Sequence, residues 1–310
     1  MLKEQVLQEL AAARGKSLSG QELARTFAVS RTAVWKAIRQ LESEGIAIQA
    51  EAGKGYRLAP YALTPFDLQL PQGVQTFFYG SIDSTNSQAK RLLAEGLQGE
   101  ALIVADEQTA GRGRCGRSFY SPKHTGVYFS YIFHPEKTLA DAVLITTAAA
   151  VSVVRAIEKI STQKPLIKWV NDIYLGDKKI CGILSEAVSD FESGNVESVI
   201  VGIGINWNTR AFPAELQQTA ASLCDESVSR AALLQAAAQE LIKVARDVKN
   251  PSIMEDYRAH SMVLGKSVKY FYNGQAFEGK ALAIEENGAL TVQTDSGIHS
   301  LHSGEITLRL

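Results

Sequence analysis

The spacing of apolar residues divides the chain into three stretches with different periodicities. In the first 58 residues, apolar positions recur every three to four residues, as on the buried face of a helix. This spacing predicts three helices: the first ends near Gly15, Ser19 opens the second in a capping box, and Ser30 caps the third, which runs to about Glu44. Residues 46–58 alternate around a Gly-Lys-Gly tip, which predicts a β-hairpin.

Three helices followed by a hairpin with a basic tip is the order of a winged helix-turn-helix, so we expect residues 1–60 to bind DNA. The N-terminal end of the third helix meets base edges in such modules. The expected DNA contacts there and at the hairpin tip are Ser30, Arg31, Thr32, Trp35, Lys36 and Lys54. Nine basic residues less six acidic ones give the first 58 residues a charge of +3, the sign that phosphate contact needs. A small three-helix docking domain is the alternative, which charge alone does not exclude.

The second stretch, residues 61–263, mixes helical and strand patterns, and its first part overlaps a proline-containing linker at residues 59–71. A helix near residues 86–94 precedes two apolar strands, and a long helix covers about residues 139–160. Strands then follow one another closely, before two more helices. This order predicts an α+β domain, with a mixed sheet and helices on one face.

From Leu264 the pattern changes to alternating strands separated by turn dipeptides. These turns are Asn273-Gly274, Asn287-Gly288 and Ser296-Gly297. Residues 264–310 are therefore predicted to form a small SH3-like β-barrel. A unit of this size buries little apolar surface, so we expect it to pack against its neighbour.

Composition narrows the class of protein. The 310 residues carry a net charge of −1, which argues against indiscriminate binding of the whole molecule to nucleic acid or membrane. No apolar run approaches the roughly 20 residues that span a bilayer, and the N-terminus lacks the apolar core of a signal peptide. Three cysteines at unrelated spacings do not indicate a disulfide framework. A reduced, cytoplasmic protein is the expectation.

Residues 109–118, TAGRGRCGRS, follow a predicted strand and combine three glycines with three arginines. Glycines allow backbone N–H groups to face an anion, and arginines offer planar forks for phosphate or carboxylate. The segment is neither a P-loop, since no Gly-Lys-Ser/Thr ending follows, nor a dinucleotide fingerprint. It predicts an anion-binding loop, with a solvated or RNA-binding loop as the alternative.

Three further segments place polar residues among apolar ones. The first, residues 168–182 (KWVNDIYLGDKKICG), has polar side chains between strand residues: Lys168, Asn171, Asp172, Lys178 and Lys179. A hairpin with a lysine-rich turn is the alternative, and it would explain Lys178 better than Lys168. SIDSTNSQAK (81–90) has polar residues at a helix start, where plain N-capping is the alternative. VGIGINWN (201–208) ends an apolar strand in small residues, which allows a ligand to approach the backbone closely.

Together, DSTN, GRGRxGR, KWxNDxY…KxxG and GxGIN resemble the biotin protein ligases. With the N-terminal winged helix and the C-terminal barrel, the whole chain resembles the bifunctional biotin ligases that are also biotin operon repressors. The resemblance is strongest over residues 81–208, and the arginine loop together with KWxND is its most specific part.

This resemblance implies an enzyme that activates the biotin carboxylate with Mg-ATP, giving biotinyl-5′-adenylate and pyrophosphate. Biotin is then transferred to one lysine of the biotin carboxyl carrier domain of acetyl-CoA carboxylase. The residues implied to bind biotin or the adenylate are Ser84, Thr85, Asn86, Gln108, Arg112, Gly113, Arg114, Trp169, Lys179, Gly182, Asn206 and Arg309. The implied catalytic residues are Arg114, Lys179 and Asp172, and Asp172 either holds Mg²⁺ or orients the incoming lysine amine.

The resemblance also implies that the adenylate acts as co-repressor and promotes a homodimer that binds palindromic operator DNA. Two residues depart from the family pattern: Cys115 stands where a basic residue is common, and Val170 stands where proline is common. A transcription regulator that senses a small molecule without chemistry is the main alternative, and a lipoate ligase is the second. The arginine loop together with Lys179 argues against a sensor of a neutral ligand.

Overall fold

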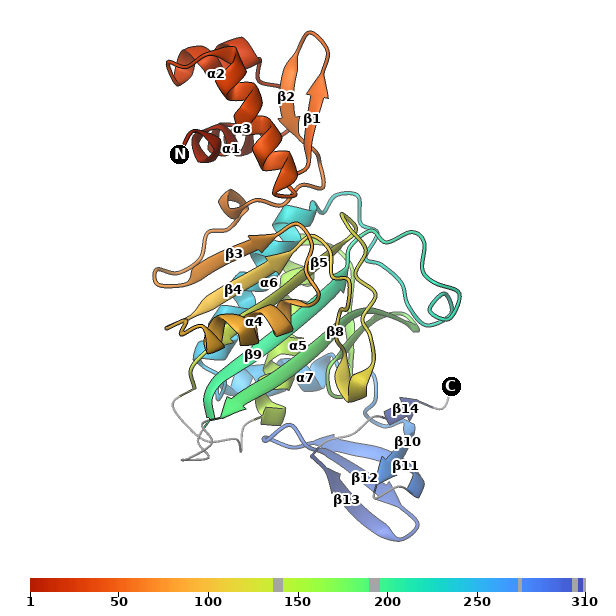
Figure 1. The fold of residues 1–310 in the computed structure, drawn as a ribbon. Coiled ribbons are helices and arrows are strands. Elements are labelled where there is room, and N and C mark those ends of the chain that lie inside the picture. The colour runs from red at the N-terminus through yellow and green to blue at the C-terminus, as the bar shows by residue number, and fades with distance from the viewer. Residues whose placement is uncertain (136–141, 190–195, 273–274, 303–305, 309–310) are drawn as a thin grey trace.

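The structure is a computed structural model that describes residues 1–135, 142–189, 196–272, 275–302 and 306–308 (Figure 1). Along the chain, a small helical unit with a two-stranded wing is followed by a large sheet with helices, and then by a small sheet of antiparallel strands.

The N-terminal unit has the predicted winged helix-turn-helix order. Its elements are α1 (Leu2–Ala12), α2 (Gly20–Thr26), α3 (Arg31–Ser43), β1 (Ile48–Glu51) and β2 (Gly55–Leu58). Both predicted caps are confirmed: the Ser19 hydroxyl accepts a hydrogen bond from the backbone N–H of Glu22 at 3.0 Å, and the Ser30 hydroxyl accepts one from Ala33 at 3.1 Å. Apolar residues at helical spacing form its core; the most buried are Val6, Leu10, Val34, Ile38 and Leu41.

A seven-stranded mixed sheet forms the centre of the molecule. Its order is β3 (Gln75–Tyr79), β4 (Ala101–Ala105), β5 (Gly126–Phe133), β9 (Val196–Asn206), β8 (Lys178–Ser189), β7 (Asp172–Leu175) and β6 (Leu166–Lys168). Strands β3 and β4 are parallel, and every other neighbouring pair is antiparallel. The predicted mixed sheet is confirmed.

Helices α5 (Ala142–Ile160), α6 (Arg230–Arg246) and α7 (Pro251–Ala259) cover one face of this sheet, and the shorter α4 (Thr85–Ala94) packs on the other (Figure 1). Alternation along β4 explains this division, since successive side chains of a strand point to opposite faces. Leu102 and Val104 join the core under α5 and α6, whereas Ala101 and Ile103 pack with residues of α4. The prediction of helices on one face therefore holds for the three C-terminal helices, and α4 adds a layer on the other.

The C-terminal unit is a five-stranded antiparallel sheet that packs against the central unit. Its strand order is β13 (Gly297–Leu301), β12 (Leu290–Thr294), β11 (Gln275–Ile284), β10 (Ser267–Tyr272) and β14 (Ile306–Leu308). The Trp169 indole N–H donates to the carbonyl of Gly288 at 2.9 Å, and Arg258 Nε donates to the carbonyl of Ile284 at 2.8 Å. The predicted turn at residues 273–274 lies outside the described residues.

The predicted linker at residues 59–71 is packed rather than exposed along its first half. Ala59, Ala62 and Thr64 are buried, and a short 3₁₀ turn follows at Pro65–Asp67. From the turn after α1, Arg14 donates to the carbonyl of Ala62 at 3.1 Å and pairs with the carboxylate of Asp67. Buried contacts therefore hold this segment between the two units. No helix in the described part of the chain is long and apolar enough to cross a membrane.

Arg230, at the start of α6, is the largest fully buried side chain and joins this segment to the sheet. Its Nε donates to the carbonyl of Gly126 at 2.6 Å, one Nη donates to the carbonyl of Tyr61 at 3.1 Å, and the same Nη pairs with the carboxylate of Asp106. The ring of Tyr61 lies 4.5 Å from that of His124, whose Nδ1 is 2.6 Å from Asp106. Four chain segments therefore meet at one buried ion pair.

Replacement of Arg230 by methionine is expected to lower the free energy of unfolding by about 3–5 kcal/mol, because it leaves Asp106 as a buried charge with its main partner removed. Urea denaturation followed by circular dichroism measures the change. Arg246→Met removes a surface arginine from its pair with Glu100 and is the matched control, with an expected loss of about 1 kcal/mol or less. Equal losses in the two variants would contradict a special role for the buried pair.

Candidate active site

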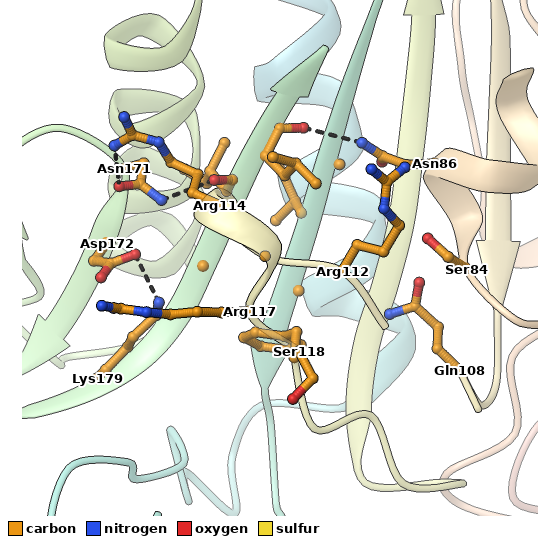
Figure 2. Close-up of a pocket in the computed structure, with 18 of the residues that line it drawn as sticks. Ser84, Asn86, Gln108, Arg112, Arg114, Arg117, Ser118, Asn171, Asp172 and Lys179 are labelled. Carbon is orange, nitrogen blue, oxygen red and sulfur yellow. Dashed lines mark hydrogen bonds and ion pairs between the residues drawn. The ribbon is translucent and has the colours of Figure 1, made fainter. Parts of the chain in front are cut away.

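A cavity of about 330 Å³ opens on the face of the sheet that carries α4 (Figure 2). Its walls come from the start of α4, the arginine loop (residues 111–118), strands β6 to β9 and single residues of two later segments. The structure brings eleven predicted site residues together around it: Ser84, Thr85, Asn86, Gln108, Arg112, Gly113, Arg114, Trp169, Asp172, Lys179 and Gly182. These eleven residues, up to 98 positions apart in sequence (Ser84 to Gly182), therefore share one cavity.

The start of α4 supplies the neutral polar part of the cavity. Ser84 is the N-cap residue, and Gln108 accepts a hydrogen bond through Oε1 from the backbone N–H of Thr85 at 2.9 Å. The other end of the Gln108 amide donates to the Ser121 hydroxyl at 2.9 Å. Gln108 is thus held in one orientation, so that it presents a fixed donor–acceptor pattern beside the helix start.

Asn86 forms part of the wall, and its amide is bound by the protein itself. Its Nδ2 donates to the carbonyl of Leu184 at 3.2 Å and to the carboxylate of Glu186 at 2.9 Å, while Oδ1 lies 2.6 Å from the Ser130 hydroxyl. A Cβ on Gly202 would lie 2.0 Å from this Oδ1, so the close approach requires glycine there. Both N–H donors of Asn86 are used, and Asn86 serves to fix the wall.

The arginine loop closes on itself and directs two arginines to opposite sides. The N–H of Gly113 donates to the carbonyl of Arg117 at 2.7 Å, and a short 3₁₀ turn runs over Arg114–Gly116. Figure 2 shows Arg112 reaching toward Asn86 and Arg114 reaching toward Asn171, whose Oδ1 accepts from Arg114 at 3.1 Å. An anion beside the loop would thus meet a guanidinium on each side.

Cys115 lies in this turn, in the left-handed region with φ of 54°, and its side chain is exposed. It does not line the cavity, so this departure from the family pattern lies at the surface. The other departure, Val170, is buried, and the Trp169–Val170 peptide bond is cis.

Strands β7 and β8 supply the opposite wall. Lys179 Nζ lies 2.7 Å from the carboxylate of Asp172, and Asp172 pairs with Gly182 across the two strands. Asn171 Nδ2 donates to the carbonyl of Ile183 at 2.9 Å, which orients the Oδ1 that Arg114 contacts. Trp169, 3% exposed, contributes an apolar wall.

The cavity is strongly cationic. Of the residues lining it, five are basic (Arg112, Arg114, Arg117, Lys168 and Lys179) and one, Asp172, is acidic, a balance of +4. Because partly enclosed charges are screened less than surface charges, this lining favours a polyanion. Burial, followed by the charge of Asp172, raises the pKa of nearby Tyr174 to about 12, so this phenol stays protonated. Burial also raises the pKa of the Cys181 thiol, which makes this cysteine a packing residue.

A resident metal site is not formed by the described side chains, among which no group of three or more His, Cys, Asp or Glu could hold an ion. Among the described residues that line the cavity, Asp172 is the one carboxylate, and it is already paired with Lys179. Mg²⁺ is commonly bound through one or two carboxylates together with substrate phosphates. A single carboxylate therefore fits a Mg²⁺ ion that is bound mainly by the phosphates of an incoming nucleotide.

One predicted site residue lies away from the cavity, a second is not described, and some lining residues were not predicted. Asn206 is 4% exposed and does not line the cavity, because its Nδ2 donates to the carbonyl of Ala221 at 3.0 Å. Arg309 lies outside the described residues. Arg117 lines the cavity, and its place in the arginine segment could have indicated it. Phe119, whose ring packs on Gly204, had no sequence signal.

The six predicted DNA-contact residues all lie at the surface of the N-terminal unit, as DNA contact requires. Trp35 is 47% exposed, and the guanidinium of Arg39 lies 5.6 Å from its ring centre. Lys54, at the tip of the wing, is 3.6 Å from Glu51. Helix α3 belongs to the N-terminal unit and lies apart from α4 and β8, whose residues line the cavity (Figure 1).

Comparisons with known families match the three units separately. The biotin/lipoate A/B protein ligase family matches residues 79–206, a helix-turn-helix domain family matches residues 3–57, and the biotin protein ligase C-terminal domain family matches residues 263–309.

Similar proteins extend these matches over the whole chain. The bifunctional ligase/repressor BirA of Bacillus subtilis is 34% identical, with 99% of this chain and 98% of that protein covered. The protein of the same name from Escherichia coli is 29% identical, with 96% and 94% covered. Among solved structures, the biotin protein ligase from Aquifex aeolicus in complex with biotin and ATP matches with a TM-score of 0.62 at 29% identity, covering 77% of this chain and 99% of that one.

Proposed function

The chain belongs to the biotin protein ligase family, in the group of bifunctional ligase/repressors, and on that premise we propose how its cavity carries out the reaction. The protein is a biotin protein ligase with biotin and ATP as substrates, and a repressor that carries a DNA-binding helix-turn-helix. The observation that carries the proposal is the +4 lining of the cavity, five basic residues against Asp172, beside a neutral polar end.

In the first half-reaction, an oxygen of the biotin carboxylate attacks the α-phosphorus of ATP, and the bond to the pyrophosphate oxygen breaks. Two anions must approach each other in this step, so catalysis depends on positive charge more than on a base. We assign this charge to Arg114 and Lys179, with Arg112 on the other side of the loop. The product is a mixed anhydride held without a covalent bond to the protein, so the reaction requires no nucleophilic side chain.

The cavity divides into two chemically distinct ends that fit the two parts of the intermediate. Ser84, Thr85 and Gln108 offer neutral donors and acceptors with fixed orientation, which suits the ureido head of biotin. Arg112, Gly113 and Arg114 would hold the carboxyl and phosphate groups, with Trp169 and Gly182 as walls. Asn206 and Arg309 remain predicted nucleotide contacts.

We propose that Mg²⁺ enters bound to ATP, because the described residues that line the cavity offer it one carboxylate, that of Asp172. In the second half-reaction the amine of the acceptor lysine attacks the acyl carbon, and AMP leaves. We propose that Asp172 orients that amine, a role supported by its contact at 2.7 Å with another ammonium group, that of Lys179. The acceptor is proposed to be the carrier domain of acetyl-CoA carboxylase.

For the repressor function, the adenylate is proposed to act as co-repressor and to promote a homodimer that binds operator DNA through two copies of α3. The exposure of the N-terminal residues of α3 supports DNA binding, because exposed side chains there can enter the major groove. The charge of this cavity argues against a sensor of a neutral ligand, because such a ligand would cover these charges without pairing them.

Biotin-dependent exchange of labelled pyrophosphate into ATP, with Mg²⁺ present, tests the reaction class and the substrate together. We expect exchange when biotin is present and no exchange when lipoate replaces it. An absence of exchange at saturating biotin would overturn the ligase assignment, and equal exchange with lipoate would overturn the choice of substrate.

Replacement of Arg114 by alanine is expected to leave the fold intact and to speed release of biotinyl-5′-adenylate about 10- to 100-fold, the size of one or two lost charge-assisted hydrogen bonds. Stopped-flow dissociation of the intermediate measures this change. Arg246→Met, which removes a cation far from the cavity, is the control. An unchanged release rate in the Arg114 variant would contradict the proposed clamp.

Deletion of residues 1–60 is expected to abolish operator binding in a gel-shift titration, while pyrophosphate exchange persists. Because the deletion uncovers surface that packs against residues 59–71, a full-length variant is needed beside it. Arg31→Ala should weaken DNA binding about tenfold, as expected for loss of one base or phosphate contact, and should leave exchange unchanged. DNA binding by the truncated protein would place the interface elsewhere.

A further inference from the structure

Glu186, on β8 at the edge of the cavity, is a partly buried carboxylate with three cationic or amide donors. Its side chain is 16% exposed. Oε1 lies 2.8 Å from Lys90 Nζ and 3.2 Å from an Nη of Arg112, and Oε2 accepts from Asn86 at 2.9 Å and from the other Nη of Arg112 at 3.4 Å. The family motifs of the sequence do not include it.

The charge of this carboxylate is secured by its surroundings. Burial alone would raise the pKa of Glu186, but hydrogen bonds from Lys90 and Asn86, followed by the charges of Lys90 and Arg112, outweigh burial and lower the pKa. Glu186 is therefore an anion at neutral pH. Lys90 and Asn86 fix its position from the side away from the arginine loop, so Glu186 is a rigid anchor rather than a mobile surface acid.

Of the two cations in this cluster, Arg112 lines the cavity, as does Asn86. Glu186 contacts the terminal fork of the guanidinium with both oxygens, which leaves Nε–H and the outer N–H groups available. The Arg112 side chain is 44% exposed and long, so without an anchor it would lose rotamer freedom on contacting a ligand. Two cations, Lys90 and Arg112, meet one carboxylate, so the cluster keeps a net positive charge toward an incoming anion.

We propose that Glu186 is a positioning residue: it holds the Arg112 guanidinium beside the arginine loop, in place to receive the acyl-phosphate anion of the intermediate. This inference rests on the proposed function, because it takes the adenylate as the anion that Arg112 meets. Asn86 contributes indirectly, by holding Glu186: its two N–H donors link the start of α4 to Leu184 and Glu186 on β8.

A double-mutant cycle separates this role from a merely structural one. Glu186→Gln keeps the size and the amide contact but removes the charge, and it is expected to speed release of biotinyl-5′-adenylate about tenfold, the size of a coupling between contacting residues. In a protein that already carries Arg112→Gln, the same change should add less than about twofold, because the partner is gone. Equal effects in both backgrounds, or no effect in either, would overturn the proposal.

Two further variants keep the test decisive if Glu186→Gln folds poorly. Glu186→Asp keeps the charge but withdraws it by one methylene from contacts that are already 3.2 and 3.4 Å long, and it should give an intermediate release rate. Glu100→Gln breaks a different glutamate–arginine pair, with Arg246, away from the cavity, and should change nothing. An Asp variant that matches the wild type would overturn the proposal.

Measurement of the unmodified protein distinguishes failure of the proposed function from failure of the role proposed for Glu186. If the unmodified protein forms no adenylate from biotin and Mg-ATP, the proposed function fails. If it forms and retains the adenylate while Glu186→Gln retains it equally well, only the role of Glu186 fails.

Discussion

The buried pair of Arg230 and Asp106 is the constraint on which the arrangement of the molecule depends. A guanidinium with no exposed surface is tolerated only where its donors are satisfied, and here they reach Gly126, Tyr61 and Asp106. These partners mark the start of β5, the segment from the DNA-binding unit and the end of β4. The segment between β4 and β5 contains the arginine loop, so the same pair fixes both ends of the segment that carries the proposed anion site.

The fold could be predicted largely from local patterns, because those patterns are caused by local physics. Ser19 and Ser30 cap helices whose first N–H groups need acceptors, and the nearly unbroken apolar runs of β4 and β5, buried at every position, reflect a sheet with two covered faces. The packing of residues 59–71 could not be predicted in this way. Three prolines suggest an exposed connection, whereas the buried contacts of Ala62 and Thr64 depend on partners far away in sequence.

The sequence could predict which residues line the site, but not which of them face a ligand and which bind other parts of the protein. The motifs indicate Asn86, Arg112 and Lys179, and the cavity contains all three. That the amide of Asn86 is used up by Leu184, Glu186 and Ser130 depends on the register of β8 against β9 and on the missing side chain of Gly202. Asn206 shows the converse: it ends the strand that lines the cavity, yet a later segment takes its side chain.

The packed segment between the first two units bears on the geometry of DNA recognition. Ala59, Ala62 and Thr64 are buried, and Arg14 and Arg230 bind the segment from the two units that it connects. The unit that contains α3 is therefore joined to the central unit by a packed segment rather than by a flexible linker. In the proposed dimer, two chains on one operator would then present their α3 helices at a set separation. Insertion of half a helical turn of DNA between the half-sites would rotate one of them to the far side of the duplex. The buried residues of this segment would therefore influence which operator spacing the protein recognises, although none of them is a predicted DNA contact.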